Sequence, residues 1–209
     1  MSALDFLSPA TAEDGAIARS PMERLAKAAG AQFEVRDGWN VATTYGAAEK
    51  RALESVAWAD VSHLGKWEMT GAGRGFGNAT RQQDAWLCPL TASRALQIGG
   101  STPNETALDV TCSYAALTIL GPLARETIAR FCALDLRPHI APPQSFRPGS
   151  VGRQPGMVLV EGPDRFLLLF GWATGEYMWT VVEDAARHLG GGPVGTETLA
   201  PSMGVSAHA

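Results

Sequence analysis

The segment from Trp58 to Thr70 constrains the fold most, because a helical periodicity stops there and a strand periodicity begins. Upstream, apolar residues recur at helical spacing, which predicts a helix over residues 47–58. Downstream, two sets of side chains alternate with a period of two, which is typical of a half-buried strand. The first set is Gly65, Trp67 and Met69, and the second is Lys66, Glu68 and Thr70.

Four side chains that can carry a charge or a proton lie close together in this junction: Asp60, Ser62, His63 and Lys66. Such a cluster is one expected form of a catalytic site. A connection between a helix and a strand, however, also uses Asp and Ser to bond loose main-chain groups. The residues alone allow both interpretations, and we place the structural turn ahead of catalysis.

Composition excludes several classes of function. The chain has 209 residues, 45% of them hydrophobic and 18% charged, which is ordinary for a globular protein and enough for a sizeable core. A net charge of -4 gives no basic surface for nucleic acid or an anionic membrane. The apolar run at residues 166–172 is too short to cross a bilayer, and residues 1–19 do not resemble a secretory signal. We therefore expect a cytoplasmic protein.

The cysteines and histidines do not predict a metal site. Cys88, Cys112 and Cys132 are odd in number, widely spaced and set in apolar patterns, which predicts reduced core residues. The four histidines are scattered and show no metal-ligand spacing. We expect no bound metal.

The first half of the chain predicts a tail, two helices and several strands. Residues 1–19 lack a sustained period and are expected to form a mobile tail. Ser20, Pro21 and Glu23 suit the start of a helix that Gly30 ends, and a strand follows around Phe33. The glycine-rich residues 71–77 fit neither a dinucleotide fingerprint nor a Walker loop, so we expect a surface loop.

From Asp84 onwards, short apolar segments are separated by turn residues. Helix and strand alternate without regular βαβ units, which predicts an α+β fold with antiparallel or mixed sheets and packed helices. We expect a single domain over residues 20–199 and a C-terminal tail over residues 200–209. The predicted elements are a hairpin (85–98), strands (108–110 and 115–120), a helix from Gly121, an ordered loop (142–148), a hairpin (157–170), a strand (177–182) and a short helix (183–189).

The order of these pieces resembles the aminomethyltransferase family, which comprises the glycine-cleavage T-protein and its folate-binding relatives, over roughly residues 20–199. The matching pieces are Gly38-Trp39, Tyr45-Gly46, Asp60-Val-Ser-His63 with Gly65, Gly121-Pro122 and Thr174-Gly-Glu176. The resemblance implies the N-terminal part of the T-protein fold. It also identifies the cluster at Asp60 as a family turn.

The second half is most similar to the small gamma subunit of heterotetrameric sarcosine oxidase. The stretches that carry this likeness are Leu120-Gly-Pro122, Phe131-Cys-Ala-Leu-Asp-Leu-Arg-Pro138 and Thr174-Gly-Glu176 followed by Trp179. The chain length fits as well, because full aminomethyltransferases continue into further domains.

The chain departs from the transferase pattern where the chemistry would lie. Asp84 falls near the place of the family's catalytic Asp, but lacks the glycines that precede it. In the folate-reading segment, the candidates Glu176, Tyr177 and Trp179 are followed by Thr180 in place of an acid. A threonine cannot accept the two hydrogen bonds that a carboxylate accepts. Residues 196–199 also lose the family's arginine.

These departures imply a non-catalytic gamma-type subunit of a sarcosine-oxidase-like flavin amine oxidoreductase. We expect this chain to bind no cofactor, and the resemblance implies FAD, FMN, NAD and tetrahydrofolate on the larger flavin- and folate-binding partner subunits. Two alternatives stay open. One is a short stand-alone folate-dependent aminomethyltransferase, methyltransferase or demethylase with Asp84 as its catalytic group. The other is a stand-alone folate-binding or repair protein, whose best-known relatives carry a Lys-Gly-Cys-Tyr signature that this chain lacks.

Overall fold

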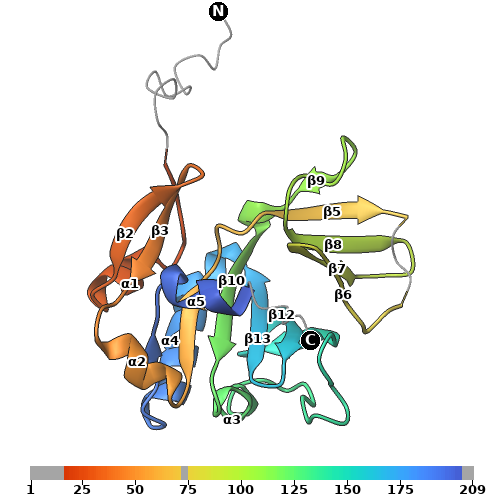
Figure 1. Ribbon diagram of the computed structural model, residues 1–209. Helices are drawn as coiled ribbons and strands as arrows, with labels where there is room; N and C mark the ends of the chain where they lie inside the picture. Colours follow the sequence, from red (N-terminus) through yellow and green to blue (C-terminus); the bar gives the residue numbers. More distant parts are fainter. Residues whose placement is uncertain (1–16, 72–74, 204–209) are drawn as a thin grey trace, which may run out of the picture.

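The structure is a computed structural model that describes residues 17–71 and 75–203, with the backbone alone for residues 200–203. Most of the two predicted tails and part of the glycine-rich loop therefore lie outside the described residues. Within them, the strands form three sheets and the helices are few and short (Figure 1). The fold is α+β, as predicted from the sequence.

A six-stranded sheet forms the centre of the molecule, with the strand order β11-β12-β13-β10-β4-β14. Its strands are β4 (Ala57–Asp60), β10 (Tyr114–Leu120), β11 (Phe146–Val151), β12 (Gln154–Gly162), β13 (Arg165–Gly171) and β14 (Gly192–Pro193). Neighbouring strands are antiparallel except for β14, which pairs in parallel with β4. Long apolar runs in β10 and β13 are buried on both faces, which explains why neither run alternates.

A five-stranded antiparallel sheet packs beside the central sheet, with the order β6-β7-β8-β5-β9. Its strands are β5 (Lys66–Thr70), β6 (Thr80–Gln82), β7 (Ala85–Pro89), β8 (Arg94–Gly99) and β9 (Leu108–Asp109). The predicted hairpin at 85–98 is confirmed, because β7 and β8 pair in register from Ala85 with Gly99 to Pro89 with Ala95.

The smallest sheet has the order β1-β3-β2, with β1 (Ala18–Arg19), β2 (Gln32–Arg36) and β3 (Trp39–Thr44). The helices are α1 (Glu23–Ala28), α2 (Ala48–Leu53), α3 (Ala124–Ala129), α4 (Gly175–Arg187) and α5 (Thr196–Met203), and the single 3-10 turns are η2 (Thr111–Ser113) and η3 (Trp172–Thr174). The ends of the predicted first helix are close to those observed. Ser20 Oγ accepts a hydrogen bond from Met22 N at 3.1 Å, and Gly30 ends the helix with φ at 92°.

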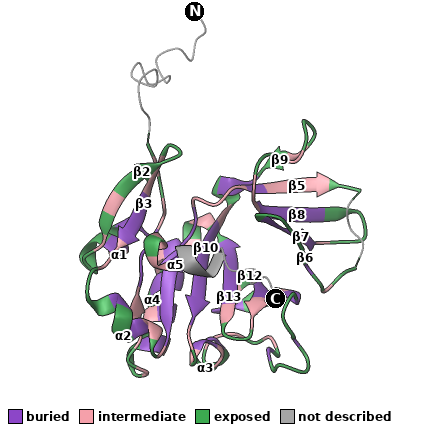
Figure 2. Ribbon diagram, in the orientation of Figure 1, coloured by how far each residue is buried: buried purple, intermediate pink, exposed green. Residues whose placement is uncertain are grey.

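The two faces of the central sheet contribute to two hydrophobic clusters. Trp58, Leu117 and Phe166 belong to the first cluster, which α1, α3 and α4 cover. Ala59 and Leu167 belong to the second cluster, which the five-stranded sheet and α5 cover. Figure 2 shows the buried residues following the central strands, while the hairpin tips and outer helix faces are exposed. The central sheet is therefore shared by both halves of the core.

The prediction of a helix over residues 47–58 is correct only for its first half. α2 ends at Leu53, and β4 begins at Ala57. All four residues of β4 are buried, because the strand lies inside the central sheet between β10 and β14. A short apolar segment without polar alternation does not distinguish a buried strand from a helix.

The strand at 177–182 and the separate helix at 183–189 are also wrong, because one helix, α4, covers Gly175–Arg187. Its buried residues are Gly175, Met178, Trp179, Val182 and Ala186, a spacing of three to four residues. Packing of this stripe against the central sheet prevails over the strand preference of the local sequence.

Three smaller expectations need correction. The loop predicted at 142–148 ends before Phe146, where β11 starts. β11 includes Pro148, and because it is an edge strand of the sheet, it tolerates a residue without an N–H. Cys88 is buried as expected, whereas Cys112 is exposed, and all three cysteines are free. α5 continues to Met203, into the segment predicted as a tail.

The helix after Gly121 is confirmed, although α3 begins at Ala124. Gly121 has φ at 112°, and a Cβ there would lie 2.6 Å from the carbonyl oxygen of Ser55. Glycine is therefore required where the chain leaves β10 and turns into the helix. Among the helices of residues 17–71 and 75–203, none is long and apolar enough to cross a membrane.

Candidate functional site

A cavity of about 490 Å³ lies between the central sheet and the five-stranded sheet, and we call it the inter-sheet cavity. Its volume is in the range of small-molecule sites. The apolar lining residues are Val61, Leu64, Trp86, Ile98, Leu167 and Leu199. The polar and charged lining residues are His63, Arg81, Asp84, Thr118, Glu161, Arg165 and Thr196. The cavity thus combines apolar walls with a few polar groups.

Glu161 and Arg165 form an ion pair at the turn between β12 and β13. Arg165 Nε donates to Glu161 Oε2 at 3.0 Å, and Trp86 Nε1 donates to Glu161 Oε1 at 3.1 Å. The Arg165 side chain is only 19% exposed and the Glu161 side chain 15%. Both oxygens of Glu161 therefore already hold protein donors, which makes this carboxylate a poor general base.

Arg165 retains hydrogen-bonding capacity that Glu161 does not use. Its Nη1 is buried and has no hydrogen-bond partner among the described residues. A guanidinium carries five N–H donors, and leaving buried donors unpaired costs free energy. Arg81 places a second guanidinium near the same wall, 5.4 Å from the ring centroid of Trp86.

Asp84 lies at the entrance of the inter-sheet cavity, exposed to solvent, just before β7. It also lines a second hollow of about 460 Å³, whose other residues include Gln82, Gln83 and Gln97. A Cβ on Gly100 would lie 3.2 Å from Asp84 Oδ1, and Gly100 has φ at 68°. A glycine at this position lets the carboxylate approach the main chain closely.

His63 is the member of the sequence cluster that reaches the inter-sheet cavity. Burial lowers its pKa to about 4, and the positive charges of Lys66 and Arg36 act in the same direction. The imidazole is therefore neutral at pH 7 and can donate or accept a hydrogen bond, but does not supply a positive charge.

Asp60, Ser62 and Lys66 instead fix the turn between β4 and β5. Asp60 Oδ1 accepts from Ser62 N at 3.0 Å, and Ser62 Oγ accepts from Ala116 N at 3.1 Å. Burial raises the pKa of Asp60, although hydrogen bonds from Ser20 and Ser62 oppose this. Lys66 Nζ donates to two carbonyl oxygens, those of Ser62 at 2.9 Å and Leu64 at 2.8 Å. These contacts satisfy the turn itself, and none of the three residues lines the cavity.

The residues considered for folate lie on α4, away from the inter-sheet cavity. Glu176 is partly exposed and accepts two hydrogen bonds from Arg24, both at 2.7 Å. Tyr177 is 45% exposed and donates its hydroxyl to the Gly152 carbonyl at 2.9 Å. Trp179 is 1% exposed and packs edge-on against Trp58, with ring centroids 5.9 Å apart. The structure does not bring these three residues together with Asp84.

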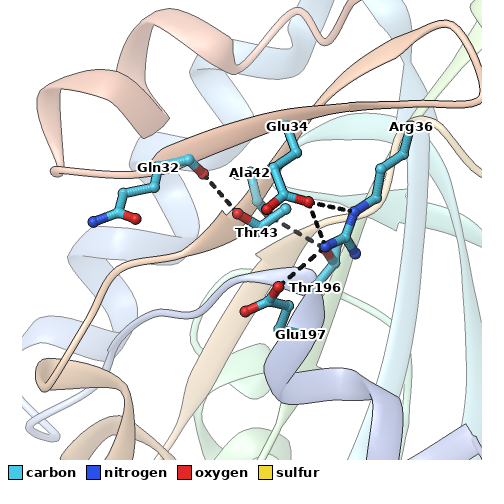
Figure 3. Close-up of polar contacts among 7 residues, drawn as sticks. All are labelled: Gln32, Glu34, Arg36, Ala42, Thr43, Thr196 and Glu197. Atoms are coloured by element: carbon cyan, nitrogen blue, oxygen red, sulfur yellow. Dashed lines mark hydrogen bonds and ion pairs between the residues drawn. The ribbon is translucent and has the colours of Figure 1, made fainter.

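The C-terminal helix α5 supplies one wall of the inter-sheet cavity through Thr196 and Leu199. Figure 3 shows how polar contacts hold its start against β2 and β3. Thr196 Oγ1 donates to the Ala42 carbonyl at 3.3 Å, and Arg36 Nη2 donates to Glu197 Oε1 at 3.1 Å. The Arg36–Glu197 contact joins the helix to β2, and a second bond within the strand, to Glu34 at 2.8 Å, holds the Arg36 side chain in place.

Two comparisons with known proteins find nothing: no family model matches, and no curated protein matches. Solved structures do match. A chain of heterotetrameric sarcosine oxidase from Corynebacterium sp. U-96, in complex with pyrrole 2-carboxylate, aligns with a TM-score of 0.66 and 16% identity. That alignment covers 83% of this chain and 96% of the other. Aminomethyltransferase T of the glycine cleavage system from Bartonella henselae aligns with a TM-score of 0.67 and 14% identity over 87% of this chain.

The chain has the T-protein fold. The resemblance inferred from short motifs is thus confirmed in three dimensions, for both the aminomethyltransferase and sarcosine oxidase. The chain spans 60% of the aminomethyltransferase chain that it matches. At these identities, the alignments establish the fold and leave the chemistry to be argued from the residues.

Asp84 and His63, both singled out from the sequence, line the inter-sheet cavity of this T-protein fold. Glu161, Arg165 and Arg81 line it as well, and the sequence did not point to them. One local signal was available for two of them. Glu161 and Arg165 flank a turn as an acid and a base four residues apart, so their pairing could have been foreseen. Their contact with Trp86 could not, since that residue is 75 positions away in the chain.

Proposed function

We propose that this chain is a non-catalytic, gamma-type subunit of a flavin-dependent amine oxidoreductase of the sarcosine oxidase kind. The carrying observation is the alignment that covers 96% of a chain from heterotetrameric sarcosine oxidase. Because it also covers 83% of this chain, the two chains are of similar size and extent. The aminomethyltransferase, in contrast, continues well beyond the aligned part.

The cavity chemistry supports a role without catalysis. Asp84 is exposed, the oxygens of Glu161 hold Trp86 and Arg165, and His63 carries no charge at neutral pH. The oxygens of Glu161 are therefore occupied, burial lowers the pKa of His63 to about 4, and water competes for the exposed carboxylate of Asp84. In this proposal FAD, FMN, NAD and tetrahydrofolate belong to the larger subunits. This chain supports their assembly in the cytoplasm.

Co-expression tests this proposal directly. The chain is produced together with flavin-dependent oxidase subunits of the sarcosine oxidase kind from its own source, and size-exclusion fractions are assayed for flavin absorbance and sarcosine-dependent hydrogen peroxide. We expect this chain to co-elute with the flavin, and the complex to lose stability or yield when it is omitted. Elution of the chain alone, with full oxidase activity in the other fractions, contradicts the proposal.

A second function has one observation in its favour. Asp84 lines a cavity large enough for a small molecule, as a folate-dependent aminomethyltransferase, methyltransferase or demethylase would need. Titration of the isolated chain with tetrahydrofolate, followed by calorimetry, separates the two functions. Tight binding that Asp84→Ala abolishes and the exposed control Asp184→Ala retains favours the transferase. No binding by the isolated chain favours the subunit.

A further inference from the structure

The guanidinium of Arg165 is held in place but only partly used. One N–H, on Nε, bonds Glu161, while the buried Nη1 has no partner among the described residues. The side chain lines the inter-sheet cavity and stays 19% exposed. Nη1 itself is shielded, so a ligand in the cavity meets the exposed part of a guanidinium that Glu161 holds in place, and a guanidinium matches a planar two-oxygen acceptor such as a carboxylate.

The strand register directs Arg165 toward the cavity. Along β13, Leu167 and Leu169 pack in the cluster on the cavity side, and Phe166 and Leu168 in the cluster on the α4 side. Arg165 shares its face with Leu167 because side chains alternate along a strand. Both residues line the inter-sheet cavity.

The charges around the cavity limit what its ligand can be. Arg81 and Arg165 are balanced by Glu161 and by Asp84 at the entrance. Since these four groups cancel, each negative charge on a ligand adds repulsion from Asp84 and Glu161, which favours one carboxylate over two. The rest of the wall is aliphatic or aromatic, including Trp86 and Leu199, which suits a flat apolar body.

We propose that Arg165 binds the carboxylate of a small monocarboxylic acid whose flat apolar body occupies the inter-sheet cavity. This goes beyond the subunit function, which assigns no ligand to this chain. Bound there, such an acid would stabilise the folded chain against unfolding without any chemical reaction. Glu161 occupies Arg165 Nε and is itself held by Trp86, so its carboxylate competes with the ligand for the guanidinium.

Calorimetric titration of the full-length chain with 2-naphthoate and with its neutral counterpart 2-naphthamide tests this. We expect the wild-type protein to bind 2-naphthoate more tightly than 2-naphthamide. Arg165→Gln should weaken 2-naphthoate binding by about tenfold to a hundredfold, since a charge-assisted hydrogen bond is lost, and leave 2-naphthamide unchanged. Glu161→Gln should strengthen 2-naphthoate binding, because it removes the competing carboxylate.

Arg125 provides the matched control. It also has a buried Nη1 without a partner among the described residues, but it lies on α3, against Phe166, and does not line the cavity. Arg125→Gln should leave both affinities unchanged. Equal affinity for the two naphthalenes in the wild type, or an equal loss in Arg125→Gln and Arg165→Gln, overturns the proposal. If Arg165→Gln does not fold, an unchanged or weaker 2-naphthoate affinity in Glu161→Gln overturns it instead.

Discussion

The amine of Lys66 lies in the protein interior, where main-chain carbonyls of the preceding turn accept its hydrogen bonds. The residue is fully buried. Burial lowers its pKa to about 8, and the negative charge of Asp60 only partly opposes this. At neutral pH the protein therefore carries a buried ammonium group, which lowers its stability relative to a neutral amine.

Stability should rise with pH as this amine loses its proton. The pKa is about 8 in the folded chain and about 10.5 when unperturbed, so the unfolded chain binds more protons between these values. We expect Lys66 alone to add about 2 to 3 kcal/mol to the free energy of unfolding across that window, measured as the wild-type change minus the Lys66→Met change, because the raised pKa of the buried Cys88 thiol acts with the opposite sign in both proteins. Denaturant unfolding at several pH values measures this difference, which the exposed Lys50→Met should not show relative to the wild type. The same pH dependence in the wild type and in Lys66→Met would contradict this assignment.

Lys66 also shows what the sequence can predict at the scale of a residue. The alternation of residues 65–70 correctly predicted a strand, β5. It grouped Lys66 with Glu68 and Thr70, although Lys66 is buried and Thr70 exposed. The difference arises because the Ser62 and Leu64 carbonyls converge on the amine, a consequence of turn geometry that periodicity does not encode.

At the scale of elements, α4 shows the same limit. Tyr177, Trp179 and Val182 favour strands, and their local run predicted one. The observed helix buries Trp179 and Val182 on one side while Tyr177 stays 45% exposed. Hairpins with their own turn residues, such as β12 with β13, were predictable because both strands and the turn lie in one short segment.

The buried stripe of α4 depends strongly on Trp179. Its ring packs edge-on against Trp58, so Trp179→Ala removes a large aromatic group from the core and should lower the free energy of unfolding by about 3 to 5 kcal/mol. Tyr177→Phe removes only the hydrogen bond to Gly152 and should cost about 1 kcal/mol. Urea unfolding of both variants measures the difference. Similar losses in the two would mean that α4 does not use Trp179 as its main anchor.

The position of α5 depends on Glu49 of α2. Its carboxylate accepts hydrogen bonds from Tyr45 N at 2.7 Å, Gly195 N at 2.8 Å and Thr198 Oγ1 at 2.6 Å. Burial raises the pKa of Glu49, but these hydrogen bonds outweigh it and leave the pKa below the ordinary value. Because the folded pKa is depressed, this stabilisation is present at neutral pH and is lost as the pH falls through the folded pKa.

Glu49→Gln should therefore weaken the attachment of α5. We expect a loss of about 1 to 3 kcal/mol at pH 7, because Gly195 and Thr198 lose a charged acceptor, and a smaller loss in acid. Hydrogen exchange of the α5 amides reports the local effect, with the exposed Glu54→Gln as the control. Unchanged α5 exchange in Glu49→Gln would show that other contacts, such as Arg36 with Glu197, suffice.

At the scale of the molecule, the order of short motifs predicted the fold better than any single element. A helix follows Gly121-Pro122 and a turn follows Asp60, as predicted, whereas the strand predicted at residues 177–182 is part of the helix α4. The site was predicted less completely. Asp84 lines the cavity as a candidate, but the Glu161 and Arg165 pair contacts Trp86 from another sheet, and such long-range contacts depend on tertiary structure.

The shared central sheet predicts that the two halves of the core unfold together. β10 contributes Leu117 to one cluster and Ala116 to the other, so separating the five-stranded sheet exposes residues of a strand that the α4 side also needs. Cys88 reports on the five-stranded sheet, since it is fully buried in β7 and burial raises the pKa of its thiol. Replacing the other two cysteines by serine makes it the sole thiol.

In that variant, thiol labelling of Cys88 and the circular dichroism of the helices should give coincident urea transitions with one midpoint. A wild-type control with exposed Cys112 should label already in the folded state, which establishes that reagent access and not reactivity limits Cys88. Labelling of Cys88 at clearly lower urea than the loss of helix would mean that the five-stranded sheet detaches first. The central sheet would then support the α4 side alone, and the inter-sheet cavity would open before the rest of the molecule unfolds.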